Sequence, residues 1–167
     1  TITVYAPSHG TAIVETYADD YDVILYTPDS DYTGSDSFDY TISDGQGGES
    51  TVITVGVIVN TQPTAMDDEF LAIVQDSEDN ILNVLINDYD LDYVFDGDPL
   101  TITEMSDPDN GTVTIDDNGT PLDPTDDVIL YTPNFGYIGD DSFTYDISDG
   151  NGGIATGTVD ITVSIPE

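Results

Sequence analysis

Four short strings occur twice in this chain at one constant spacing, and this repetition limits the possible folds more than any other feature. VILYTP occupies 23–28 and 128–133, and DSF occupies 36–38 and 141–143. ISDG occupies 42–45 and 147–150, and GG occupies 47–48 and 152–153. The spacing is about the size of one small domain, which is too long for the unit of a solenoid. The repetition therefore predicts tandem domains, each with its own core.

The repeat also sets the predicted domain boundaries. TIT at 1–3 corresponds to TIT at 101–103. The first domain, 1–59, therefore matches only the later part of the second domain, 60–167. We expect the first domain to lack its first strands, and we interpret the chain as a window from a longer or processed protein.

Apolar and polar residues alternate over short stretches that are bounded by turn residues, as in strands with one buried face. The first copy predicts strands at 1–5, 11–15, 21–27, 37–43 and 50–59. The second copy predicts strands at 64–74, 80–86, 100–105, 112–116, 127–132, 142–148 and 154–165. No window has the period of an amphipathic helix. The predicted fold class is all-β: tandem Ig-like or cadherin-like antiparallel β-sandwiches, the first one incomplete.

The charge balance excludes several classes of function. The chain has 35 acidic side chains, no lysine or arginine and one histidine, which gives a formal charge of -35. It therefore lacks the basic side chains that bind nucleic acid or anionic lipid, and it has no apolar run long enough for membrane insertion. A disordered acidic segment is an alternative, but 11 tyrosines and 5 phenylalanines in periodic strands favour a packed core. The chain has no cysteine and can form no disulfide, so bound cations are the cross-links available to it.

An acidic loop follows an apolar stretch at residues 83–100. Five aspartates fall within eleven positions there: Asp88, Asp90, Asp92, Asp96 and Asp98. No basic side chain exists to pair with them, so a bound cation would have to hold them together. Ca²⁺ suits such a set, because it takes about 6–8 oxygen ligands from carboxylates, amides and carbonyls. An EF-hand is excluded, because the sixth position counted from Asp88 is Tyr93 rather than glycine, and the twelfth is Pro99 rather than glutamate.

The motifs of the second copy, taken together, resemble one known family. They are NTQPTAMDD, VLINDYDLD, DGDPLTIT, NGTVTI, VILYTP and GDDSFTYDISDGNGG, followed by alternating valine and threonine. This set resembles the bacterial cadherin-like or Ig-like tandem repeat of large secreted adhesins and matrix proteins. The resemblance covers residues 60–165 fully and 1–59 as a partial copy. The resemblance implies a calcium-binding sandwich domain, with successive domains joined end to end into a stiff rod. This chain departs from the family pattern where residues 93–95 separate Asp92 from Asp96.

The resemblance also implies a calcium site near the domain junction. Asp67 and Asp68, which follow the linker, would meet the aspartates of the loop at 88–98, with Asn60 or Asn87 as neutral ligands. A solvated acidic loop with no fixed ligand is the alternative. The two SDG turns are ambiguous, since Asp44 and Asp149 also suit ordinary turns. The candidate metal ligands are Asp67, Asp68, Asn87, Asp88, Asp90, Asp92, Asp96, Asp98 and Asp149.

Other polar residues have simpler interpretations. Asp36 and Asp141 precede matching strands and could cap a strand end or reach an ion. His9 occupies a turn where the second copy has Asn110, which favours a turn residue over a general base. The NGT sequons at 110–112 and 118–120 also fit plain turns, which we prefer. No nucleophile and base are placed together, so we expect no enzyme activity.

The expected function is therefore mechanical and adhesive. The sequence predicts a calcium-stiffened spacer of a secreted or cell-surface protein, whose partners are neighbouring repeats of the same or identical chains. One alternative is a homopolymer filament built by strand complementation between chains. Another is a carbohydrate-binding module that stacks tyrosines on surface glycans, with Tyr5, Tyr17, Tyr26 and Tyr32 as candidates.

Overall fold

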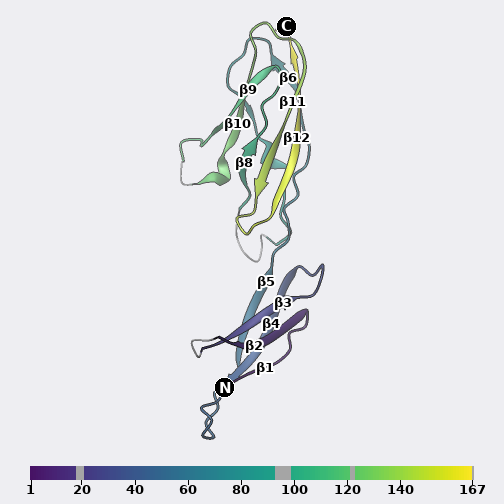
Figure 1. Ribbon diagram of the computed structural model, residues 1–167. Helices are drawn as coiled ribbons and strands as arrows, with labels where there is room; N and C mark the ends of the chain where they lie inside the picture. Colours follow the sequence, from purple (N-terminus) through teal and green to yellow (C-terminus); the bar gives the residue numbers. More distant parts are fainter. Residues whose placement is uncertain (18–20, 93–98, 121–122, 167) are drawn as a thin grey trace. The chain divides into compact units, whose positions relative to one another are not determined.

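The computed structural model describes residues 1–17, 21–92, 99–120 and 123–166 and divides the chain into two compact units (Figure 1). Unit 1 comprises Thr1–Thr61, and unit 2 comprises Gln62–Glu167. Strands dominate both units, and the described residues contain no helix long and apolar enough to cross a membrane. The all-β prediction is confirmed.

Unit 2 is a sandwich of two sheets. One sheet has the order β6-β12-β11-β8, and its strands are Asp68–Val74, Ile154–Ser164, Gly139–Ser148 and Thr101–Met105. The other has the order β7-β10-β9, and its strands are Asn80–Leu82, Val128–Pro133 and Gly111–Asp116. Neighbouring strands are antiparallel, except that β6 runs parallel to β12. The predicted antiparallel sandwich is confirmed, apart from this one parallel pair among the described strands.

The core of unit 2 forms because its strands alternate strictly. In β11 every second side chain from Asp141 to Ile147 is buried, while most of the residues between them are exposed. The same period places alternate residues of β10 and β12 inside. Figure 1 shows β11 and β12 running side by side as the two long strands of this unit. The core consists of Ile73, Leu82, Val84, Ile102, Ile129, Tyr131, Phe143, Tyr145, Ile147, Val159, Ile161 and Val163.

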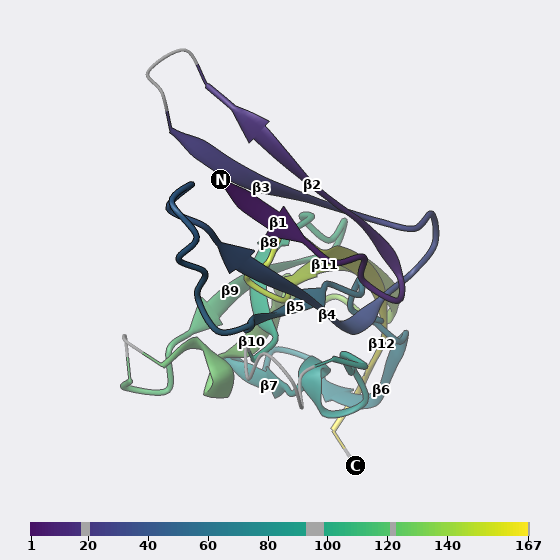
Figure 2. The ribbon, with the colours of Figure 1, turned by 90° about the horizontal axis from the view of Figure 1, so that it is seen from below.

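Unit 1 repeats most of this arrangement with fewer strands. Its sheets have the orders β1-β4-β5 and β2-β3 (Figure 2). The register is the same in both units, because Phe38 pairs with Val55 as Phe143 pairs with Val159. The described residues of unit 1 hold no counterpart of β6 or β7. The strands are Ile2–Val4, Gly10–Thr16, Asp22–Pro28, Gly34–Ile42 and Ile53–Val59.

The missing strands leave unit 1 with a shallower core. Among its described apolar side chains only Phe38 is buried, at 6% exposed. Ile24 and Tyr26 are half-buried, whereas Ile129 and Tyr131, at the same places in unit 2, are 0% exposed.

One predicted strand was wrong in part. The segment 80–86 forms a strand only as far as Leu82, and Val84–Ile86 is a turn of 3-10 helix, η1. A short apolar run does not distinguish these two conformations by periodicity, and here Val84 reaches the core from the helical turn. A second such turn, η2, spans Pro124–Asp126, and the carboxylate of Asp123 accepts a hydrogen bond from the amide of Thr125 at its start.

Candidate metal centre

The segment that leads into β6 and the segment after η1 lie side by side in unit 2. Thr64 and Tyr89 exchange two backbone hydrogen bonds, of 2.8 and 3.1 Å. The amide of Met66 donates to Oδ1 of Asp88 at 2.7 Å. These contacts bring Asp68 and Asp88 together, although the two residues are far apart in the sequence.

Tyr145 joins this pair from β11. Its hydroxyl oxygen lies 3.1 Å from Oδ2 of Asp68, 3.0 Å from Oδ2 of Asp88 and 3.1 Å from the carbonyl oxygen of Met66. A phenol has one proton to donate, so it satisfies only one of these acceptors at a time. The site therefore gathers more acceptor oxygens around Tyr145 than its single proton can serve. We call Asp68, Asp88, Tyr145 and the Met66 carbonyl the Tyr145 cluster.

Burial and mutual repulsion disfavour negative charge in the Tyr145 cluster. Burial, together with the nearby charge of Asp88, raises the pKa of Asp68 to about 6, despite its hydrogen bond with Tyr145. Burial also raises the pKa of Asp88. The pKa of the Tyr145 hydroxyl is raised by burial and by both carboxylates. A cation at this position would relieve the repulsion, and the chain has no lysine or arginine to supply one.

A second group of carboxylates is formed by Asp90 and Asp92 of the acidic loop with Asp149 of the SDG turn. Asp92 is 2% exposed and Asp149 is 1% exposed. The amide of Asp92 donates to Oδ1 of Asp90 at 3.2 Å. Burial raises the pKa of Asp90 to about 6, and the neighbouring Asp92 and Asp149 also raise it. We call Asp90, Asp92 and Asp149 the loop cluster.

The SDG turns form the same way in both units. Oδ1 of Asp149 accepts hydrogen bonds from the amides of Asn151 and Gly153, at 2.8 and 2.9 Å. Oδ1 of Asp44 accepts from the amides of Gln46 and Gly48 at the same two distances. Both aspartates thus have the turn role that the sequence allowed. Asp149 differs from Asp44 because it is buried and lies close enough to Asp90 for its charge to raise the pKa of that residue.

The predicted ligands do not all converge. Oδ1 of Asp67 accepts a hydrogen bond from the amide of Thr158 at 3.0 Å, so this carboxylate contacts β12 rather than the Tyr145 cluster. The side-chain Nδ2 of Asn87 donates to the backbone carbonyl of Asp67 at 3.3 Å, and this side chain also approaches Asp68. Asp96 and Asp98 lie outside the described residues. Within the described ranges, no group of three or more acidic or histidine side chains could hold a metal ion.

Sequence reasoning missed the role of Tyr145. The available signal was its place in the alternating strand SFTYDIS, which predicts a buried side chain. A buried tyrosine hydroxyl needs a hydrogen-bond partner, so polar groups could have been expected around it.

The open choice for Asp36 and Asp141 is resolved in favour of capping. Oδ2 of Asp141 accepts from the amide of Asn110 at 3.1 Å and from the hydroxyl of Tyr131 at 2.8 Å. Asp36 accepts from the amides of Ser8 and His9 and from the hydroxyl of Tyr26. Each carboxylate therefore joins a turn to a strand end.

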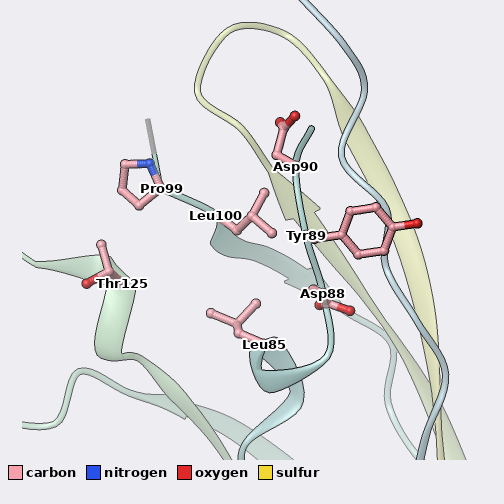
Figure 3. Close-up of a pocket in the computed structure, with 7 residues that line it drawn as sticks. All are labelled: Leu85, Asp88, Tyr89, Asp90, Pro99, Leu100 and Thr125. Carbon is pink, nitrogen blue, oxygen red and sulfur yellow. The ribbon is translucent and has the colours of Figure 1, made fainter. Parts of the chain in front are cut away.

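A pocket of about 340 Å³ opens beside the acidic segment. Figure 3 shows Leu85, Pro99, Leu100 and Thr125 around it, with the segment of Asp88, Tyr89 and Asp90 along one side. The ring of Tyr89 points away from Thr125. Two leucines and a proline make most of this lining apolar.

The remaining candidates have structural surroundings. His9 stacks on the ring of Tyr32 at 4.2 Å in its turn. Tyr26 packs beside Phe38. Tyr5 and Tyr17 are each 49% exposed, and Tyr17 stacks on Tyr21 at 5.4 Å.

Comparison with known proteins gives one family match. The family model described as bacterial Ig domain matches residues 1–56 and again 60–162. No protein among the curated ones matches the chain. The strand order and the repeated register are consistent with this family match in both units.

Several solved structures share a distant likeness. An endo-fucoidan hydrolase from glycoside hydrolase family 107 is 20% identical with a TM-score of 0.39, covering 98% of this chain and 28% of that one. The extracellular domain of protocadherin GammaB4 is 16% identical with a TM-score of 0.43, covering 98% and 26%. Mouse clustered PcdhgC3 EC1-3 is 8% identical with a TM-score of 0.40, covering 100% and 56%. The chain spans about a quarter to just over half of these proteins.

Proposed function

This chain belongs to the bacterial Ig domain family, and we propose that it is a calcium-stabilised repeat of an extracellular or cell-surface adhesin or fibre, acting as a rigid spacer. Its work is mechanical and adhesive rather than catalytic. A high negative charge suits a protein whose surroundings supply salt and calcium, since both screen repulsion between its acids.

The Tyr145 cluster carries the calcium part of the proposal. Two carboxylates and a backbone carbonyl surround one phenolic proton, and the chain has no lysine or arginine to balance them. These are the hard oxygen ligands that Ca²⁺ prefers, and water completes its coordination. Asp68, Asp88 and the Met66 carbonyl would hold the ion.

Calcium would stabilise unit 2, because Asp68 and Asp88, which repel each other without the ion, would both bind it. The ion would tie the start of β6 to the segment after η1. Extracellular modules bind Ca²⁺ with Kd of about 10⁻⁴ to 10⁻³ M, so millimolar calcium would largely fill such a site. Binding to the folded state adds RT ln(1 + [L]/Kd) to its stability.

Calorimetry of the chain tests this function. We expect the unfolding midpoint to rise by several degrees when EGTA is replaced by millimolar CaCl₂, because about 1 kcal/mol moves a domain of this size by about 4 °C. MgCl₂ is the control for ionic strength and charge, since Mg²⁺ demands stricter geometry and retains its water. A calcium shift below about 2 °C, or one that MgCl₂ reproduces in full, would contradict structural calcium.

A second function is favoured by the smaller sandwich of unit 1. We propose, as the alternative role, a subunit of an extracellular filament in which strands are exchanged between chains. The supporting observation is that the described residues of unit 1 form five strands, β1 to β5, whereas those of unit 2 form seven, β6 to β12. Sedimentation at rising concentration tests it: growing polymers support the filament, and a chain that stays monomeric refutes it.

A further inference from the structure

Asp68 and Asp88 share one hydrogen-bond donor, the hydroxyl of Tyr145. Its oxygen lies 3.1 Å from Oδ2 of Asp68, and 3.0 and 3.2 Å from the two carboxylate oxygens of Asp88. Asp88 also accepts a hydrogen bond from the amide of Met66, and the side chain of Asn87 approaches Asp68. Those two groups each orient one carboxylate, whereas Tyr145 contacts both.

Tyr145 can reach both carboxylates because a glycine lies opposite it. Tyr145 and Gly157 pair across β11 and β12, and both are buried. A Cβ on Gly157 would lie 2.6 Å from Cε1 of the Tyr145 ring and 2.8 Å from its hydroxyl oxygen. The ring therefore crosses the glycine backbone, in space that any other residue at this position would fill.

Unit 1 has the same tyrosine without this space. Tyr40 occupies the place of Tyr145 in the matching string SFDYTIS. Its partner across β4 and β5 is Ile53 rather than a glycine. Strand pairing at this place therefore does not require glycine, so we relate Gly157 to the position of the Tyr145 ring.

The position of the Tyr145 hydroxyl matters because two neighbouring carboxylates repel each other. The chain has no lysine or arginine to offset that repulsion. In the metal-free protein, the phenolic proton attracts both Asp68 and Asp88 toward one point. A metal ion binds more tightly to ligands that are already assembled, because less free energy is then needed to bring them together.

We propose that Tyr145 is the positioning residue of the calcium site and acts through Asp68 and Asp88 rather than as a ligand. Its hydroxyl holds both carboxylates within reach of one ion before the ion arrives, and Gly157 fixes the ring that carries this hydroxyl. Each carboxylate has two oxygens, so one can bind the ion while another accepts the phenolic proton. The inference rests on the proposed calcium function and adds the residue that prepares the site.

Calorimetric titration of the whole chain with CaCl₂ tests the proposal. We expect Tyr145→Phe to weaken calcium binding by at least about tenfold, as is typical when a side chain that orients metal ligands is removed. Tyr131→Phe is the matched control, because Tyr131 is also 0% exposed and also donates to a carboxylate, Oδ2 of Asp141, at 2.8 Å. It lies outside the Tyr145 cluster, so its removal should lower stability but leave the calcium Kd unchanged.

Near-ultraviolet circular dichroism provides a second readout, since calcium should change the surroundings of the Tyr145 ring. We expect the calcium-induced change in the tyrosine signal to be largely absent in Tyr145→Phe and retained in Tyr131→Phe. Both variants are titrated well below their unfolding midpoints, so that the measurement reports the folded state.

Gly157→Ala tests the same geometry with the hydroxyl retained. The new Cβ would displace the ring, so this variant should also bind calcium more weakly than the wild type. Gly56→Ala is its control, since nothing lies within 4 Å of a Cβ there, and it should leave the calcium Kd unchanged. Equal calcium affinity of the two glycine variants would contradict the role assigned to Gly157.

The titrations distinguish failure of this inference from failure of the calcium function. If the wild type binds calcium and Tyr145→Phe binds it equally or more tightly, the positioning role is refuted and the calcium function stands. Equal losses of affinity in Tyr145→Phe and Tyr131→Phe would also refute the positioning role, because they would report lost stability alone. A wild type that binds no calcium would overturn both.

Discussion

The hydroxyl of Tyr131 donates to Oδ2 of Asp141 at 2.8 Å inside unit 2, and Tyr26 makes the same bond to Asp36 in unit 1 at 3.0 Å. Each carboxylate also accepts hydrogen bonds from a turn, which lies between β8 and β9 in unit 2 and between β1 and β2 in unit 1. Gly111 makes room for this arrangement, because a Cβ there would lie 2.3 Å from the Tyr131 ring. The hydrogen bond thus links the turn, the strand end and the aromatic core in both units.

Tyr131→Phe should destabilise unit 2 by about 1.5–3 kcal/mol, since it removes a hydrogen bond to a buried carboxylate. Urea unfolding would measure the loss. Tyr89→Phe is the control, because Tyr89 is 48% exposed. It should change stability by less than about 0.5 kcal/mol. Equal effects of the two substitutions would contradict the structural role of the Tyr131 hydroxyl.

Asp68→Asn combined with Asp88→Asn should remove most of the calcium-dependent rise in the unfolding midpoint. The change keeps the size of both side chains but removes the charges that would hold the ion. The matched control is Glu78→Gln with Asp107→Asn, which removes two charges at exposed positions. Calorimetry with EGTA and with CaCl₂ compares them, and a control variant that lost as much of the calcium shift would argue against the Tyr145 cluster as the site.

The pKa values of Asp68 and Asp90, each raised to about 6, make the folded state bind more protons than the unfolded state. Their contribution to stability is therefore fully present below the unfolded pKa of about 4 and is lost as pH rises through about 6. In calcium-free buffer, the temperature of the unfolding midpoint should therefore decrease as the pH is raised from 4 to 7.

The D68N/D90N variant should reduce that fall, because neither amide titrates. The variant with Glu78→Gln and Asp107→Asn again matches the change in charge and should retain more of the wild-type slope. A slope unchanged in D68N/D90N would show that other groups set the pH dependence.

Gly153→Ala should destabilise unit 2 by about 1–3 kcal/mol, because the new Cβ would lie 2.0 Å from Oδ2 of Asp149 and 2.8 Å from Cδ of Pro63. The turn would have to open and disturb the buried carboxylate. Gly56→Ala is the control, since nothing lies within 4 Å of a Cβ at that position. Thermal unfolding compares the two, and a neutral Gly153→Ala variant would show that the turn has more room than the structure indicates.

The sequence alone predicted the strands and the repetition, because both are local. Alternation in VILYTP and in SFTYDIS defines a buried face whatever surrounds it. The same logic failed at Val84, where an apolar run too short for a periodic signal became helical. It also failed at β6, whose parallel pairing with β12 depends on strands distant in the sequence.

For the candidate site, too, some features could be predicted from the sequence and others depended on the tertiary structure. Composition and spacing identified Asp88, Asp90 and Asp92 as members of an acidic loop without lysine or arginine to pair with, and the family resemblance added Asp68. Only the tertiary structure determined that Asp67 turns to β12, that Asp68 and Asp88 meet at Tyr145, and that Asp149 is buried. Composition sets how much charge a chain must accommodate, but which carboxylates come together depends on strand pairing between residues far apart in the chain.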